Sequence, residues 1–131
     1  MPTREHIQAE IDALKNAGQD RIRHKYLAQL NVKTGRDTVV YFSSFGIQRP
    51  FPVPSAALSV STEDIQGFMA SLHELKGDKL DLVLHSPGGS LEAADQIVQY
   101  LRAKYRDIRA IIPQNAMSAA TMIACACDEI V

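Results

Sequence analysis

Two short loops of this 131-residue chain carry the residue types that acyl-transfer chemistry needs. The first loop, Ser86–Ser90, reads Ser-Pro-Gly-Gly-Ser, and its paired glycines allow the main chain to approach a ligand closely. The N–H groups of Gly88 and Gly89 stand before a predicted helix, where they are suited to hold an oxyanion. The alternative is a tight turn between a strand and a helix that needs only the conformational freedom of glycine.

The second loop carries a serine among small residues, in the order Asn-Ala-Met-Ser-Ala-Ala-Thr from Asn115 to Thr121. Ser118 opens a predicted helix soon after a predicted strand, which is where the nucleophile of α/β hydrolases stands, although the glycines of G-x-S-x-G are missing. Small neighbours keep bulk away from its hydroxyl. The alternative is an ordinary serine that caps the helix or packs against it.

The elements around these loops alternate between strand and helix. Strands are predicted over residues 38–45, 80–85, 108–112 and 128–131. Helices are predicted from Ser61 or Thr62 to about residue 75, over 90–105 with Ser90 as the cap, and over 117–125. This order is typical of an α/β fold with a largely parallel sheet, and ligand sites of such sheets lie at the carboxyl ends of the strands.

The chain is predicted to divide into an N-terminal helical segment, 1–33, and a domain over 34–131. Ile7, Ile11 and Leu14 share one face of a helix over 3–16, which Thr3 is expected to cap and Gly18 to end. A second apolar stripe consists of Ile22, Tyr26, Leu27 and Leu30. The two helices are expected to form a hairpin that packs on the domain or on another subunit. Residues 46–61, with three alternate prolines, are predicted to be an extended loop.

The composition is that of an ordinary globular domain, with 46% hydrophobic and 22% charged residues and a net charge of −1. This balance argues against a nucleic-acid partner. No apolar stretch approaches the roughly 18 residues of a membrane span, and no signal peptide is visible, so a cytoplasmic location is expected.

Cys125 and Cys127 are too few for a zinc site and too close for a disulfide, which predicts two small buried apolar residues.

In combination, the two loops resemble a known family. Ser-Pro-Gly-Gly after a strand, followed one β-α-β step later by Ala-Met-Ser-Ala-Ala, is similar to the Clp-fold (ClpP/crotonase-like) serine peptidases. The likeness is greatest to the serine dehydrogenase proteinase family of the signal-peptide-peptidase (SppA-like) group, and it covers about residues 38–131, including the final Ala-Cys-Asp-Glu-Ile-Val.

The resemblance implies a serine endopeptidase of that fold. Ser118 matches the nucleophile, Gly88 and Gly89 match the oxyanion loop, and the N–H of Ala119 would be a second oxyanion donor. The resemblance further implies a peptide or protein substrate and a homo-oligomer, with no metal or organic cofactor. Some members of the group associate with membranes, so a peripheral membrane association stays open.

A nucleophilic serine also needs a base, which in these families is a Lys or His that follows it. No Lys or His follows Ser118 in this sequence, so the base is expected beyond Val131, with this chain a fragment of the domain. His85 is an upstream candidate, with contact to the main chain or substrate as its alternative role.

Two other functions stay open. One is an inactive homologue that acts as an assembly or scaffold partner, and the other is a crotonase-like acyl-CoA enzyme, which needs no serine.

Overall fold

The computed structural model describes residues 2–14 and 19–131, and the chain divides into two compact units, residues 1–35 and 36–131. The elements, in chain order, are α1 (Arg4–Leu14), α2 (Gln19–Thr34), β1 (Asp37–Phe42), the 3-10 helix η2 (Ser55–Leu58), α3 (Asp64–Leu72), β2 (Lys79–His85), α4 (Leu91–Lys104), β3 (Asp107–Ile111), α5 (Ala119–Cys125) and β4 (Glu129–Ile130). The predicted alternation of strands and helices is confirmed.

The four strands form one parallel sheet in the order β1-β2-β3-β4. Val39 pairs with Leu82, Leu82 with Ala110, and Ala110 with Ile130, so one row of residues crosses the whole sheet. The predicted α/β fold with a parallel sheet is therefore confirmed. Because all strands are parallel, the loops that follow β2 and β3 emerge at the same edge of the sheet.

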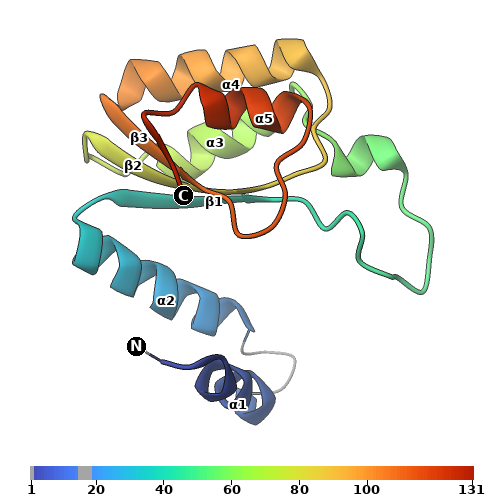
Figure 1. The fold of residues 1–131 in the computed structure, drawn as a ribbon, viewed down its shortest axis with the longest axis vertical. Helices are drawn as coiled ribbons and strands as arrows, with labels where there is room; N and C mark the ends of the chain where they lie inside the picture. Colours follow the sequence, from blue (N-terminus) through green and yellow to red (C-terminus); the bar gives the residue numbers. More distant parts are fainter. Residues whose placement is uncertain (1, 15–18) are drawn as a thin grey trace. The chain divides into compact units, whose positions relative to one another are not determined.

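Helices α3, α4 and α5 cover one face of this sheet (Figure 1). Leu80, Leu82 and Leu84 alternate along β2 and are fully buried under these helices in a single apolar cluster. Burying a leucine side chain contributes roughly 1.5–3 kcal/mol, so this row is a main source of the stability of the unit. The core fixes β2, and β2 in turn places the Ser86–Ser90 loop.

Asp81 lies on β2 between these leucines and is completely buried. Its carboxylate accepts two hydrogen bonds from Arg109, at 2.9 and 2.8 Å, and pairs with Nε of Arg36 at 2.8 Å. Arg36 also binds the carboxylate of Asp107, which holds the pKa of Asp107 below its usual range. A buried carboxylate is tolerated because two guanidinium groups satisfy it.

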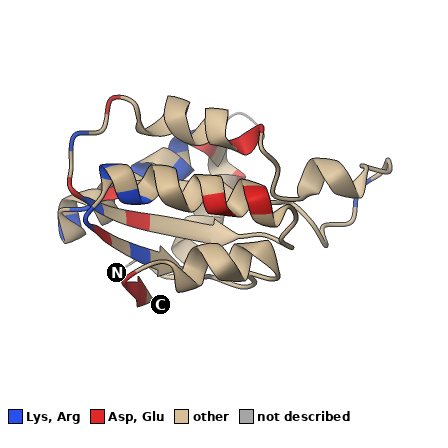
Figure 2. Ribbon diagram, turned by 90° about the horizontal axis from the view of Figure 1, so that it is seen from above, with Lys and Arg blue, Asp and Glu red and all other residues tan. Residues whose placement is uncertain are grey.

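The helix ends follow the expected capping chemistry in two of three cases. The N–H of Ala93 donates to the Ser90 hydroxyl at 3.1 Å, so Ser90 caps α4 as predicted, and the N–H of His6 donates to the Thr3 hydroxyl. Figure 2 shows acidic residues near the start of α4 and basic residues near its end, which suits the helix dipole.

The predicted cap of α3 is wrong. This helix begins at Asp64, and neither the Ser61 nor the Thr62 hydroxyl caps it. The bond runs the other way, because the N–H of Ser61 donates to the Asp64 carboxylate at 2.8 Å. The helix also ends at Leu72 rather than near residue 75.

The prediction for the two cysteines is wrong in part. Cys125 is exposed at the end of α5, whereas Cys127 is half-buried and its thiol donates to the carbonyl of Ile123. Burial raises the pKa of the Cys127 thiol to about 11. A seven-residue helix of small side chains leaves its solvent face open, and Cys125 lies on that face.

The N-terminal unit is a pair of helices, as predicted. Lys25 on α2 pairs with Glu10 on α1 at 2.6 Å, and Ile22 is the buried member of the predicted stripe on α2. The unit ends at Gly35, whereas the sequence predicts a boundary after residue 33. Gly18, expected to end the first helix, lies outside the described residues. None of the helices in the described ranges is long and apolar enough to cross a membrane.

Candidate functional site

The two loops singled out by the sequence meet at the carboxyl ends of β2 and β3. Ser86 and Ala116 form a parallel β-bridge just beyond the strands. In this bridge the N–H of Ser86 donates to the carbonyl of Asn115 at 3.0 Å, and the N–H of Met117 donates to the carbonyl of Ser86 at 3.1 Å. The sheet therefore continues by one pair into the loops and sets their relative position.

Gly88 lies directly against Ser118. A Cβ atom on Gly88 would stand 2.6 Å from the Cβ of Ser118 and 2.4 Å from the carbonyl oxygen of Met117. The φ of Gly88 is +91°, a value that residues with side chains rarely adopt. The site therefore requires glycine at this position both for space and for conformation.

Ser118 has a strained main chain, with φ 52° and ψ −124°. Among the residues that the structure describes, it is the one non-glycine residue with a positive φ. Such a conformation costs about 1–3 kcal/mol and is concentrated at functional sites. The strain marks a sharp turn between β3 and α5, of the kind that presents a nucleophilic serine.

The hydroxyl of Ser118 is exposed and does not cap α5. The helix begins at Ala119 rather than at Met117, so Ser118 stands just outside it. In the described ranges no group is hydrogen-bonded to this hydroxyl. Of the two interpretations of Ser118, the capping serine therefore has no support from its contacts.

The main-chain N–H groups beside Ser118 differ in their bonding. The N–H of Gly88 donates to the hydroxyl of Ser86 at 3.1 Å and is not available to a ligand. Within residues 19–131 no acceptor is bonded to the N–H of Gly89 or Ala119. Neither loop contains a charged residue, so within these loops the main-chain N–H groups are the donors suited to a negative charge.

Val60 fixes the glycine pair from the side opposite Ser86. Its N–H donates to the carbonyl of Gly88 at 2.8 Å, and its carbonyl accepts from the N–H of Ser90 at 2.9 Å. A Cβ atom on Gly89 would stand 2.5 Å from the main chain of Val60. No residue pattern indicated a role for Val60, because it acts through main-chain atoms, which do not depend on the residue type.

His85 is buried at the end of β2 and stacks between two phenylalanines. The ring centroids lie 4.7 Å from Phe42 and 4.8 Å from Phe45. Its Nδ1 accepts a hydrogen bond from the N–H of Asn115 at 3.3 Å. These contacts favour a bracing role for His85 against the loop that carries Ser118, which matches the alternative role considered for it.

Three lysines that precede Ser118 in the domain, Lys76, Lys79 and Lys104, do not contact the two loops. Nζ of Lys104 donates to the carbonyl of Leu75 at 2.8 Å, Lys79 lies 3.9 Å from Asp107, and Lys76 is exposed. Their contacts lie at the amino end of β2 and the carboxyl end of α4, away from both loops. In the part of the chain that the structure describes, no group of three or more His, Cys, Asp and Glu residues could hold a metal ion.

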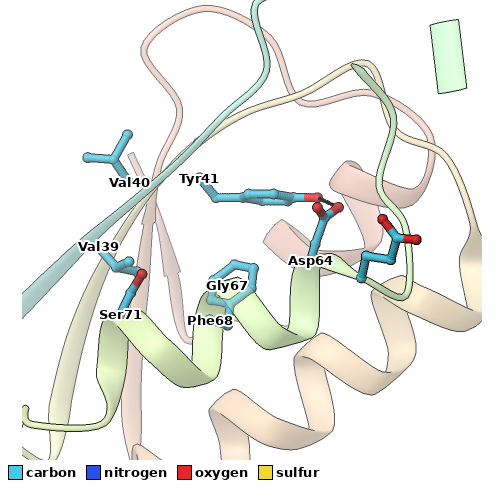
Figure 3. A pocket seen from close by; sticks show the side chains of 8 residues that line it. Val39, Val40, Tyr41, Asp64, Gly67, Phe68 and Ser71 are labelled. Atoms are coloured by element: carbon cyan, nitrogen blue, oxygen red, sulfur yellow. Dashed lines mark hydrogen bonds between the residues drawn. The ribbon is translucent and has the colours of Figure 1, made fainter. Parts of the chain in front are cut away.

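A pocket of about 260 Å³ lies elsewhere, between β1 and α3 (Figure 3). The Tyr41 hydroxyl donates to the Asp64 carboxylate there at 2.6 Å, and burial raises the pKa of Tyr41. The residues that line this pocket are Val39, Val40, Tyr41, Glu63, Asp64, Gly67, Phe68 and Ser71. None of them belongs to the two loops, so this pocket is distinct from the candidate site.

Two curated proteins of Methanocaldococcus jannaschii are similar to this chain. Uncharacterized protein MJ0137 is 38% identical over 73 residues, which are 55% of this chain and 26% of that protein. Uncharacterized protein MJ1495 is 34% identical over 73 residues, 55% of this chain and 25% of that protein. The chain thus spans about a quarter of the length of these relatives. No solved structure matches the chain.

The family model of ClpP-like SDH-type serine proteinases matches residues 59–131. This segment is more than half of the chain and contains Val60 and both loops. The chain therefore belongs to the family of ClpP-like SDH-type serine proteinases.

Proposed function

We propose that this chain supplies the nucleophile and the oxyanion hole of a serine endopeptidase, with Ser118 as the nucleophile. One observation carries the proposal: the hydroxyl of Ser118 is exposed and unbonded on a strained turn, against Gly88 and two main-chain N–H groups that have no acceptor within residues 19–131. A serine that only packs or caps a helix does not require a strained main-chain conformation of this kind.

The proposed reaction has two steps. The Oγ of Ser118 attacks the peptide carbonyl carbon while a base takes the hydroxyl proton, and the amine leaves with that proton as the C–N bond breaks. Water then attacks the resulting ester while the base takes one of its protons, and this proton passes to the Oγ of Ser118 as the ester bond breaks and the acid is released. The substrate is a peptide or protein, and a homo-oligomeric assembly is the form that we propose by analogy with the fold.

The N–H groups of Gly89 and Ala119 are the proposed oxyanion donors. Both are unbonded within residues 19–131, whereas the N–H of Gly88 is held by Ser86. Gly88 itself provides close approach, because it carries no side chain against Ser118. Loss of one donor of this kind typically slows kcat about 100- to 1,000-fold.

The proposed base is a Lys or His that follows Val131 in a longer gene product. None follows Ser118 in this chain, and Nδ1 of His85 is bonded to the main chain of Asn115. The curated relatives are about four times as long as the aligned segment, which leaves room for such a residue.

The test is labelling of the complete gene product with a serine-directed fluorophosphonate probe. The native protein should be labelled, Ser118→Ala should abolish labelling, and Ser71→Ala, which removes an exposed serine on α3, should leave it unchanged. A folded native protein that does not react, or labelling that survives in Ser118→Ala, would contradict the proposal. The same result separates the peptidase from an inactive scaffold and from an acyl-CoA enzyme, since neither needs a reactive serine.

A further inference from the structure

We propose that Ser86 is a positioning residue that aligns the oxyanion donor with the nucleophile. This inference rests on the proposed function and assigns a role to a side chain that touches neither the substrate nor the reacting atoms. Ser86 is 2% exposed and follows β2 directly, so its contacts are shielded from water.

Ser86 is bonded to both loops of the site through different atoms. Its main chain holds the Ser118 loop through the N–H of Met117 and the carbonyl of Asn115. Its hydroxyl accepts the N–H of Gly88 in its own loop at 3.1 Å. Ser86 therefore connects the two loops next to Gly88, where an added Cβ atom would stand 2.6 Å from the Cβ of Ser118.

The Ser86 hydroxyl and the Val60 N–H together determine where the N–H of Gly89 points. The N–H of Gly88 is held by Ser86, and the carbonyl of Gly88 is held by the N–H of Val60 at 2.8 Å. These two bonds fix the peptide planes on both sides of the Gly88 Cα atom. Because the peptide between Gly88 and Gly89 is trans, its N–H points away from Val60 and is left for a ligand.

Removal of the Ser86 hydroxyl should therefore act on the transition state more than on substrate binding. Without this acceptor the peptide between Pro87 and Gly88 loses its hydrogen bond, and only the bond from Val60 still holds Gly88. Because glycine has no side chain to restrict its main chain, the Gly88 Cα atom can then shift and carry the next peptide with it. The N–H of Gly89 would then spend less time in line with the oxyanion. Ground-state binding depends little on this donor, since oxyanion holes contact the charge that develops during reaction.

The experiment uses the complete gene product with Ser86→Ala, Ser86→Cys and a matched control, Ser43→Ala. Ser43 lies outside the two loops, and its hydroxyl donates to the carbonyl of Leu58 at 2.6 Å, so the control also loses one hydrogen bond from a hydroxyl to the main chain. Hydrolysis of fluorescein-labelled casein gives kcat and KM, and the fluorophosphonate probe gives the labelling rate of Ser118. Thermal unfolding reports the fold of each variant.

We expect Ser86→Ala to lower kcat and the labelling rate by about 10- to 100-fold, with KM within about threefold of the native value. Ser86→Cys retains a weak acceptor and should fall between the native protein and alanine, and Ser43→Ala should keep the native kcat. If alanine prevents folding, the cysteine variant decides. A folded Ser86 variant with the native kcat, or one in which only KM changes, overturns the positioning role. The proposed function still stands in that case, provided that the native protein is labelled at Ser118. A native protein that fails to react at Ser118 overturns both.

Discussion

At the scale of single residues, two glycines of this chain would respond in opposite ways to the same added methyl group. A Cβ on Gly88 would collide with main-chain and Cβ atoms at 2.4 and 2.6 Å, which cannot move aside as a flexible side chain would. A Cβ on Gly67, within α3, would meet nothing within 4 Å. The two positions therefore separate the effect of close packing at the site from the general effect of replacing glycine.

Gly88→Ala should destabilise the protein by about 1–3 kcal/mol and reduce labelling of Ser118 more than about 100-fold. Gly67→Ala should stabilise it by about 0.5–1 kcal/mol, because alanine favours helix, and should leave labelling unchanged. Chemical denaturation and the fluorophosphonate probe measure both effects. Equal behaviour of the two variants would show that Gly88 does not lie against Ser118.

At the scale of elements, Asp128 joins α4, β3 and the start of β4. Its carboxylate pairs with Arg102 at 2.7 Å and accepts from the N–H of Ile108 at 2.7 Å. The bond from Arg102, followed by that from Ile108, holds the pKa of Asp128 below its usual range. Arg102 in addition donates to the carbonyl of Ala126, so one side chain anchors the segment that follows α5.

Because the folded protein lowers the pKa of Asp128, the stabilising effect of this carboxylate is complete above about pH 3.9, its ordinary value when unfolded. The effect is lost as the pH falls from there through the lower pKa of the folded state. Asp128→Asn should therefore have a lower thermal midpoint than the native protein at pH 7. In acid, where the native Asp128 is protonated, the two thermal midpoints should lie closer together. Asp95→Asn, on the exposed face of α4, serves as the control. A deficit that is the same at about pH 7 and about pH 2.5 would exclude this ionic contribution.

Elements of this chain could be predicted from sequence better than their contacts could. The near-continuous apolar run of β2 and the Ser90 cap are local patterns, and the alternating order of strands and helices predicts that the two loops lie at one edge of the sheet. The ion pairs of Asp81 were not predictable, because Arg36 and Arg109 lie on other parts of the chain. The positive φ of Ser118 had no signal either, since glycine is the residue that usually indicates such values.

The sequence pointed to residues that the structure brings together, but not to the differences in their hydrogen bonding. Spacing and resemblance pointed to Gly88 and Gly89 as equivalent donors, whereas the hydroxyl of Ser86 takes the N–H of one and leaves that of the other. Hydrogen bonds of this kind depend on the direction of each peptide plane, which residue types do not specify. The contact of Val60 with the glycine pair is invisible in sequence for the same reason.

At the scale of the whole molecule, the division into two units predicts where the chain tolerates truncation. Both loops, together with Val60 and His85, belong to residues 36–131. A gene product that starts at Arg36 should therefore keep the labelling rate of Ser118 within about threefold, since it retains the nucleophile and both proposed oxyanion donors. Light scattering of the native and shortened forms tests whether residues 1–35 serve assembly.

A product that starts one residue later, at Asp37, is the matched comparison. It loses Arg36, which pairs with the fully buried Asp81 and with Asp107. Removing one partner of a buried ion pair costs about 3 kcal/mol or more, so this form should unfold at a lower temperature than the form that keeps Arg36. Equal thermal midpoints would mean that Arg109 alone satisfies Asp81.

The main-chain conformation of Ser118 means that selection for stability and selection for turnover favour different residues at this position. A population of variants screened only for heat resistance should accumulate glycine at this position, because glycine adopts a φ of 52° without strain. A population screened for turnover should retain serine despite its lower stability. If Ser118 is the nucleophile that we propose, glycine is expected at this position only in relatives that have lost catalysis, and active relatives are expected to keep the strained serine.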